Sequence, residues 1–307
     1  MDRQMAGCRS QGVRIRRQEE QKSGVEENYF RSSDLRKRAA PGMDEAPYYR
    51  TGITVGSPNT EPVIIVENLT ARYGDVTILE DVSFEVRRGE RLMILGGSGC
   101  GKSTLLKHMI GLLKPYSGRI LINGIDIAQA DGEALHRVRR EIGVLFQADA
   151  LFGSMSLAEN VALPLVEYTG LPPELIREIV RMKLGLVHLA GYENHMPAEL
   201  SGGMRKRAGL ARAMSLDPTF LFFDEPWAGL DPVTAAELDI LIRSLNEGIG
   251  TTMVFVTQEL ASIFSLAERA IMLHKDTKGI IARGTPADLR EKSTDPRVLH
   301  FFNRQAD

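Results

Sequence analysis

One glycine-rich stretch constrains this chain more than any other feature: Gly96-Gly97-Ser98-Gly99-Cys100-Gly101-Lys102-Ser103-Thr104. It follows a short apolar run and precedes apolar residues at helical spacing, so the pattern predicts strand, loop and helix. Glycines let consecutive backbone N–H groups turn inward, and the helix N-terminus adds about half a positive charge. Lys102 can then reach the outer phosphates of a nucleotide, and the Ser103 hydroxyl can bind Mg²⁺. The alternative is a simple glycine turn between a strand and a helix.

Length and composition limit the class of protein. The chain has 307 residues, of which 43% are hydrophobic and 25% are charged, as in ordinary soluble globular proteins. A net charge of −2 gives no sign of nucleic-acid binding, and we expect no nucleic-acid partner. The two cysteines, Cys8 and Cys100, lie far apart, which argues against a disulfide framework and favours a reducing cytosol. No apolar run approaches the ~20 residues of a membrane span, so a membrane role would need another protein.

The first 60 residues differ from the rest of the chain. Residues 1–50 contain 11 Lys+Arg and 8 Asp+Glu, interleaved with Gly, Ser and Gln, and no apolar periodicity persists. This composition predicts a disordered polar leader over residues 1–60. It could be a solvated tail or a tether to an anionic surface, and Met43 could be the true start of the protein.

The remaining residues, 61–307, show the patterns of an α/β fold. Strands are predicted at Val63–Val66, Thr77–Leu79, Val82–Val86, Ile120–Ile122, Ile142–Phe146, Phe220–Phe223 and Met253–Val256. The later runs are continuously apolar, as in parallel strands covered on both faces, and helices alternate with them. Between Ser156 and Ser201 the pattern becomes helical, with a break at 170–173, and one helix face is formed by Leu175, Ile179, Met182, Leu186 and Leu189. We predict a mostly parallel core sheet with an inserted helical subdomain at about 148–215.

A pair of carboxylates follows one buried strand. The run Phe220–Phe223 ends in Asp224 and Glu225, directly before Pro226. Two carboxylates at the carboxyl end of a buried strand are costly unless a cation or a phosphate uses them. Asp224 fits a residue that organises Mg²⁺, and Glu225 fits a base that polarises the attacking water. The alternative is a strand end that turns to solvent at the proline.

A second helix start could also bind phosphate. Ser201-Gly202-Gly203 precedes a helical pattern and would offer orphan N–H groups and a positive dipole, although it could be an ordinary helix cap before a basic turn. One nucleotide cannot easily use both glycine-rich starts unless two copies of the chain face each other. Farther on, Asp231 precedes Pro232 and suits the N-cap of another helix.

Together these motifs resemble the nucleotide-binding subunits of ABC transporters over about residues 61–307. The resemblance implies a P-loop ATPase domain with a mostly parallel core sheet, an antiparallel β subdomain and the helical insertion. It also implies a head-to-tail homodimer, in which ATP lies between the phosphate loop of one copy and Ser201–Gly203 of the other. Tyr73 stands where the family stacks an aromatic ring on adenine, although a strand-edge tyrosine is the alternative. Gln147 stands where the family contacts Mg²⁺ and the γ-phosphate, and Asp231 closes a loop of the nucleotide site.

Further stretches are similar to the Mla/Mce-type branch of this family: 107–112, 142–147, 150–165, the Met204 form of the signature and the ending 295–302. This branch implies a separate integral membrane permease, an Mce-domain substrate-binding protein, and phospholipid or another hydrophobic solute as cargo. The chain would then lie peripherally on the cytoplasmic face of the inner membrane. The alternatives are a soluble ABC ATPase that works outside transport, and a regulatory ATP-binding subunit with slow turnover.

Two residues raise separate questions about the chemistry. The family places a histidine at the end of the strand after the carboxylate pair, whereas this chain has Gln258. An amide can donate a hydrogen bond to the γ-phosphate but cannot carry charge, so we expect hydrolysis to survive through Glu225 with weaker pH dependence. Cys100 lies beside Lys102 at a helix N-terminus, where a thiolate would be stabilised. It is otherwise a small neutral residue that fills space in the loop.

Overall fold

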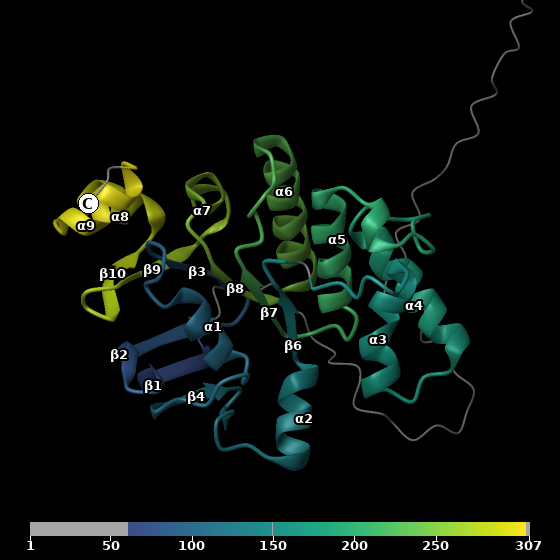
Figure 1. Ribbon diagram of the computed structural model, residues 1–307, viewed down its shortest axis with the longest axis horizontal. Coiled ribbons are helices and arrows are strands. Elements are labelled where there is room, and N and C mark those ends of the chain that lie inside the picture. Colours follow the sequence, from purple (N-terminus) through teal and green to yellow (C-terminus); the bar gives the residue numbers. More distant parts are fainter. Residues whose placement is uncertain (1–60, 149, 305–307) are drawn as a thin grey trace, which may run out of the picture. The chain divides into compact units, whose positions relative to one another are not determined.

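The computed structural model describes residues 61–148 and 150–304 of the chain. The predicted leader at 1–60, the alternative start at Met43, and Cys8 therefore lie outside the described residues. The predicted ATPase region begins at residue 61, where the description begins. Its elements form two β-sheets with helices around them (Figure 1).

The smaller sheet is antiparallel, with strand order β2-β1-β4-β5. Its strands are β1 (Pro62–Tyr73), β2 (Val76–Arg87), β4 (Ser117–Ile122) and β5 (Ile125–Asp126). The prediction of two separate strands at 77–79 and 82–86 was wrong, because β2 runs through both. Asp81 adopts a left-handed φ of 50° within β2, and Asn68 of β1 donates to its Oδ1 at 2.7 Å. An irregular position inside the strand thus produced the break in the apolar pattern.

The larger sheet has the order β10-β9-β3-β8-β7-β6, and only β10 runs antiparallel to its neighbour. Its strands are β3 (Arg91–Leu95), β6 (Ile142–Leu145), β7 (Phe220–Asp224), β8 (Thr252–Val256), β9 (Arg269–His274) and β10 (Gly279–Gly284). Val256 pairs with both Ile94 and Asp224, so β3, β8 and β7 end at the same level. The loops that follow these three strands therefore leave one edge of the sheet, where ligands of parallel sheets bind.

Two hydrophobic clusters cover the two faces of this sheet. In β3, Leu92 and Ile94 join the cluster shared with the antiparallel sheet and the helices at 102–109 and 132–140, whereas Met93 and Leu95 join the cluster shared with the later helices. Figure 1 shows α6 and α7 on one side of the core strands and β1, β2 and β4 on the other. The helices around the sheet are α1 (Lys102–Met109), α2 (Gly132–Arg140), α6 (Pro232–Ile249), α7 (Leu260–Leu266), α8 (Pro286–Lys292) and α9 (Pro296–Phe302). Phe302 of α9 is buried, and its ring lies beside that of Phe264 in α7.

The helical insertion lies between β6 and β7 and contains α3 (Leu157–Tyr168), α4 (Pro173–Leu186) and α5 (Gly202–Ala213). Ser156 starts α3 with a reciprocal capping box with Glu159. The chain breaks between α3 and α4, as the Gly-Leu-Pro-Pro stretch predicts. The predicted fold class is confirmed, while the limits 148–215 stay a prediction.

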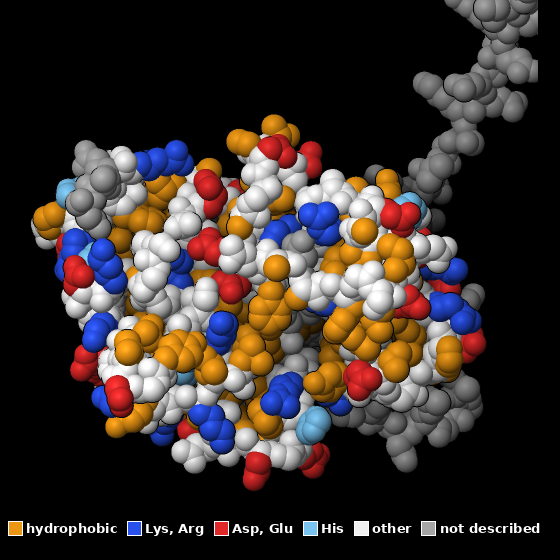
Figure 2. Space-filling view, in the orientation of Figure 1, with side chains coloured by type: hydrophobic (Ala, Val, Ile, Leu, Met, Phe, Trp, Pro, Cys, Tyr) orange, Lys and Arg blue, Asp and Glu red, His pale blue; other side chains and the backbone are white. Residues whose placement is uncertain are grey.

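The helical character of α4 was predicted correctly, but only part of the predicted apolar face is buried: Ile179 packs against the core, as does Leu189 just beyond α4. Leu175, Met182 and Leu186 are 40–51% exposed, whereas the inner face is formed by Ile176, Val180, Lys183 and Leu184. The physical reason is that Lys183 can be buried because its ammonium group pairs with Asp217, so a charged residue replaces an apolar one in the packing stripe. Figure 2 shows hydrophobic side chains at the surface where α3 and α4 lie in Figure 1.

Candidate functional site

A polar cavity of about 550 Å³ opens at the carboxyl edge of the larger sheet. It is lined by Ile78, Ser98, Gly99, Gly101, Lys102, Ser103, Thr104, Gln147, Glu225, Trp227, Ala228, Gly229, Leu230, Gln258 and Glu259. Segments that lie more than a hundred residues apart in the sequence therefore meet in one cavity. The reason is the common level at which β3, β7 and β8 end.

The loop between β3 and α1 has the geometry of a phosphate cradle. Gly96 has φ 145°, and a Cβ there would lie 2.5 Å from both Cys100 Sγ and Leu273 O, so only glycine fits. The Lys102 ammonium group folds back onto the loop and donates to Gly96 O at 2.8 Å and Gly97 O at 3.2 Å. Gly101 caps α1 without a side-chain bond to the first turn. The backbone N–H groups of that turn can therefore bind an anion.

Glu225 faces this loop from the end of β7. Its Oε1 lies 3.8 Å from Lys102 Nζ, and its backbone has the uncommon left-handed φ of 46°. The backbone N–H of Glu225 donates to Val256 O at 2.9 Å, which fixes the turn. Burial raises the pKa of Glu225, while Lys102 and a hydrogen bond from the Thr257 hydroxyl act in the opposite direction. A carboxylate with a raised pKa is suited to accept a proton from water near neutral pH.

Asp224 and Ser103 meet beside Glu225. The Ser103 hydroxyl donates to Asp224 Oδ1 at 2.9 Å, and Asp224 is buried. A hydroxyl and a carboxylate in contact are a donor set that suits Mg²⁺, which takes its remaining ligands from phosphates and water. Across the part of the chain that the structure describes, no group of three or more His, Cys, Asp or Glu could hold a metal ion by itself.

Two glutamines also line the cavity. Gln147 follows β6 and Gln258 follows β8, and both line the cavity at the positions that the sequence predicts. Lys206 of α5 is buried, and its ammonium group donates to the backbone oxygen of Gln147. The helical insertion is thereby bonded to a residue of the cavity.

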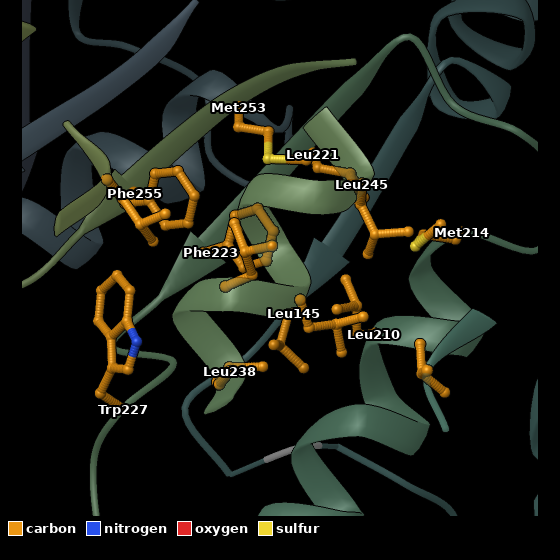
Figure 3. Packing of buried hydrophobic residues seen from close by; sticks show 14 of the residues in the cluster. Leu145, Leu210, Met214, Leu221, Phe223, Trp227, Leu238, Leu245, Met253 and Phe255 are labelled. Atoms are coloured by element: carbon orange, nitrogen blue, oxygen red, sulfur yellow. The ribbon is translucent and has the colours of Figure 1, made fainter. Parts of the chain in front are cut away.

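Trp227 is a cavity residue that the sequence reasoning missed. Its indole is buried and stacks on Phe255, which in turn stacks on Phe223 (Figure 3). Its position directly after the Asp224-Glu225-Pro226 turn was the available signal, because a large ring so close to two functional carboxylates must lie near them.

Several predicted site residues lie outside this cavity. Ser201 caps α5 by accepting a hydrogen bond from Met204 N at 3.3 Å, but among the described residues none of Ser201, Gly202 and Gly203 lines the cavity. Asp231 caps α6 as predicted, with its Oδ1 accepting from Val233 N and Thr234 N. Tyr73 ends β1 with its ring 49% exposed and does not line the cavity.

The surroundings of Cys100 argue against the interpretation of its thiol as a stabilised thiolate. The residue is 3% exposed, and burial raises its pKa, outweighing the lowering effect of Lys102. The thiolate is therefore disfavoured, and Cys100 is the small neutral residue that fills the space behind the loop.

The site geometry agrees with comparisons to known proteins. Residues 79–228 match the ABC transporter family. This chain is 43% identical to the intermembrane phospholipid transport system ATP-binding protein MlaF of Haemophilus influenzae. The match extends over 245 residues, which are 80% of this chain and 92% of that protein. This chain belongs to the ABC transporter ATP-binding family.

This chain is also similar to other members of the family. It is 45% identical to the probable ribonucleotide transport ATP-binding protein mkl of Mycobacterium leprae, over 78% of this chain and 68% of that protein. The dimeric structure of MJ0796, a bacterial ABC transporter cassette, matches with a TM-score of 0.66 at 33% identity, over 72% of this chain and 98% of the cassette. The same cassette is also known in a post-hydrolysis state bound to ADP and Pi. This ABC chain is an ATP-binding subunit with ATPase chemistry.

Proposed function

We propose that this chain is the ATP-hydrolysing subunit of a lipid-moving ABC transporter, in which two copies work head to tail. The cavity at the carboxyl edge of the larger sheet is lined by residues of the phosphate loop and by Glu225, while Ser201–Gly203, the second glycine-rich helix start, does not line it. A phosphate loop that lines the cavity and a second glycine-rich helix start that does not would fit two copies that complete each other. This observation carries the proposal, and the dimeric cassette among the similar structures supports it.

The residues of the cavity divide the work of hydrolysis. Lys102 exchanges its contacts with Gly96, Gly97 and Glu225 for the outer phosphates of ATP. Glu225 polarises the attacking water. The Thr257 hydroxyl and the backbone oxygen of Val256 hold Glu225 in place through hydrogen bonds. Gln258 donates a hydrogen bond to the γ-phosphate from the end of β8. Positioning and electrostatics supply most of the catalysis in phosphoryl transfer.

Mg²⁺ fits the same site. Ser103 and Asp224 would hold it together with Gln147, because the first two already meet in a hydrogen bond and the third faces the same cavity. When bound, the ion would neutralise charge that develops on the phosphates.

The helical insertion would transmit the state of the nucleotide. Lys206 donates to the backbone oxygen of Gln147, and Arg212 donates to Ala150 O at 2.7 Å, so α5 grips the segment after β6 at two points. A displacement of Gln147 by ATP therefore moves α5 and the insertion with it. We place a separate integral membrane permease against this insertion, with the chain lying on the cytoplasmic face of the inner membrane. Within residues 61–148 and 150–304, no helix combines the length and apolar character that a membrane crossing requires.

Cargo follows from the relatives. The MlaF proteins are named for phospholipid transport and the match spans nearly their whole length, so we favour phospholipid or another hydrophobic solute as the cargo. The resemblance to the Mla/Mce-type branch adds an Mce-domain partner to this proposal. The mkl proteins are named for ribonucleotide transport, which makes a nucleotide cargo the competing possibility.

Substitution of the proposed base tests the mechanism. Glu225→Gln should keep ATP binding, abolish most turnover and trap an ATP-bound dimer, because the amide cannot accept the proton from water. Glu247→Gln is the matched control, because it makes the same chemical change at an exposed residue near the C-terminus of α6. This variant should hydrolyse ATP normally. Light scattering with and without ATP would measure the dimer. Wild-type hydrolysis by Glu225→Gln would refute the role of Glu225, and a monomer under all conditions would refute the head-to-tail arrangement.

The cargo needs a separate experiment. The chain is co-purified with its permease, reconstituted in vesicles that contain fluorescent phospholipid, and assayed for ATP-dependent lipid transfer. Transfer that requires active Glu225 would support lipid as the cargo. Transfer of ribonucleotides in place of lipid would refute it.

A further inference from the structure

The indole of Trp227 makes a buried hydrogen bond that the mechanism above does not use. Its Nε1 donates to Asp239 Oδ1 at 2.7 Å, and both residues are buried. The indole of Trp227 also stacks on the ring of Phe255, with the two ring centroids 5.7 Å apart. Figure 3 shows the indole nitrogen on the side of the ring that faces α6, the helix that carries Asp239. The ring is thus fixed both by stacking and by a charged acceptor.

Asp239 also holds a second segment of the chain. Its carboxylate accepts hydrogen bonds from the hydroxyls of Ser262 and Ser265, both on α7, and Arg243 adds a favourable positive charge. Burial raises the pKa of Asp239, and these partners act against that effect. A carboxylate is costly inside a protein unless it is hydrogen-bonded, so its position is determined by the donors around it.

The two segments that meet at Asp239 are the two that deliver proposed functional groups to the cavity. Trp227 lies two residues after Glu225, and a tight turn links them because Ala228 N donates to Glu225 O at 3.1 Å. On the other side, α7 begins two residues after Gln258. One carboxylate therefore connects the turn that carries Glu225 with the helix that follows Gln258.

We propose that Asp239 is a positioning residue for ATP hydrolysis, which holds Glu225 through Trp227 and holds Gln258 through α7. Asp239 does not line the cavity, and it acts by fixing the separation of Glu225 and Gln258, which do. The inference rests on the proposed role of Glu225. It concerns a residue on the buried side of α6, outside the motifs that the sequence analysis identified.

The test uses the full-length chain and two changes at one position. Asp239→Leu keeps the branching at Cγ but is larger and offers no acceptor, whereas Asp239→Asn keeps the volume and an acceptor oxygen. We expect Asp239→Leu to lower kcat by roughly ten- to a hundred-fold, the scale of a misplaced reacting group. The KM for ATP should stay within about two-fold, because the phosphate loop is untouched. Asp239→Asn should restore most of kcat.

The chain contains a single tryptophan, so its fluorescence reports Trp227 alone. Loss of the charged acceptor in Asp239→Leu should shift the emission, and Asp239→Asn should shift it less. Trp227→Phe keeps a ring against Phe255 but removes the N–H donor, and it should lower kcat as well. The kcat losses of Asp239→Leu and Trp227→Phe should overlap in the double variant, because the two residues act through one contact.

Asn246→Leu separates positioning from stability. Asn246 lies on the same helix, is equally buried, and donates to Gly89 O and Thr251 O far from Glu225. It should lower Tm without lowering kcat. The proposal is overturned if Asp239→Leu leaves kcat unchanged. It is also overturned if the Asp239→Leu and Asn246→Leu variants lose equal kcat at equal loss of Tm, or if the kcat losses of Asp239→Leu and Trp227→Phe multiply in the double variant.

If Asp239→Leu does not fold, Trp227→Phe carries the test, and an unchanged kcat there overturns the proposal equally. Normal hydrolysis by Glu225→Gln would instead overturn the role of Glu225, so the two failures remain distinguishable.

Discussion

The close approach of α5 to α6 makes Gly203→Ala an informative substitution. Gly203 is the second residue of α5, and a Cβ there would lie 2.4 Å from Cγ2 of Thr234 on α6. Thr234 cannot turn its methyl group away without loss, because its hydroxyl donates to Asp231 Oδ2 at 2.6 Å and its backbone N–H donates to Oδ1 of the same carboxylate. The alanine must therefore push the two helices apart or break the cap of α6.

The expected cost combines two opposing effects. Overpacking costs about 1–3 kcal/mol in a closely packed region, and here Gly203 is buried while hydrogen bonds to Asp231 hold Thr234 in place. Alanine gains roughly 0.5–1 kcal/mol over glycine inside a helix, through the smaller conformational entropy of the unfolded chain. The balance is a loss of about 1 kcal/mol, which lowers Tm by ~2–4 °C in a domain of this size.

Two further variants isolate the clash. In Gly202→Ala the nearest atom to the new Cβ is Leu230 Cδ2 at 3.8 Å, an ordinary contact, so Tm should stay unchanged or rise slightly. Thr234→Ser removes the methyl group and keeps the hydroxyl, so Gly203→Ala should cost little in that background. Thermal unfolding of the nucleotide-free chain, followed by circular dichroism, excludes any effect of lost phosphate contacts. The reasoning is refuted if Gly202→Ala and Gly203→Ala lower Tm equally, or if Thr234→Ser brings no rescue.

Two other predictions concern titration. Hydrogen bonds from Arg297 lower the pKa of Asp295 from 3.8 to about 2, so this contact stabilises the fold above pH 3.8 and is lost as pH falls toward 2. The difference in urea midpoint between wild type and Asp295→Asn should therefore shrink over that range, and a constant difference would contradict this. Because burial raises the pKa of Cys100, iodoacetamide should modify it slowly at neutral pH until the chain unfolds, as mass spectrometry of the Cys100 peptide would show. Rapid labelling that bound ATP blocks would instead support a reactive thiolate in the loop.

Local chemistry made several features readable in the sequence. The glycines of the phosphate loop, the Ser201 cap of α5 and the Asp231-Pro232 start of α6 each depend on backbone groups a few residues away. Continuous apolar runs identified the buried strands β7 and β8, because parallel strands are covered on both faces, but the buried strand β9 was missed. These signals predicted an α/β fold with a helical insertion, and together with the family resemblance they predicted most residues that line the cavity.

What the sequence could not determine depends on partners that are distant along the chain. The buried face of α4 includes Lys183 because its ammonium group pairs with Asp217. The pKa of Cys100 is raised because the folded loop buries its thiol. Asp239 carries no motif at all, since its partners Trp227 and Ser262 come from separate segments. Such contacts are decided by strand register and helix packing, which bring side chains together in space without leaving a local pattern. The sequence by itself determined the phosphate loop and its chemistry, and the tertiary structure decided which residues hold that loop's partners in place.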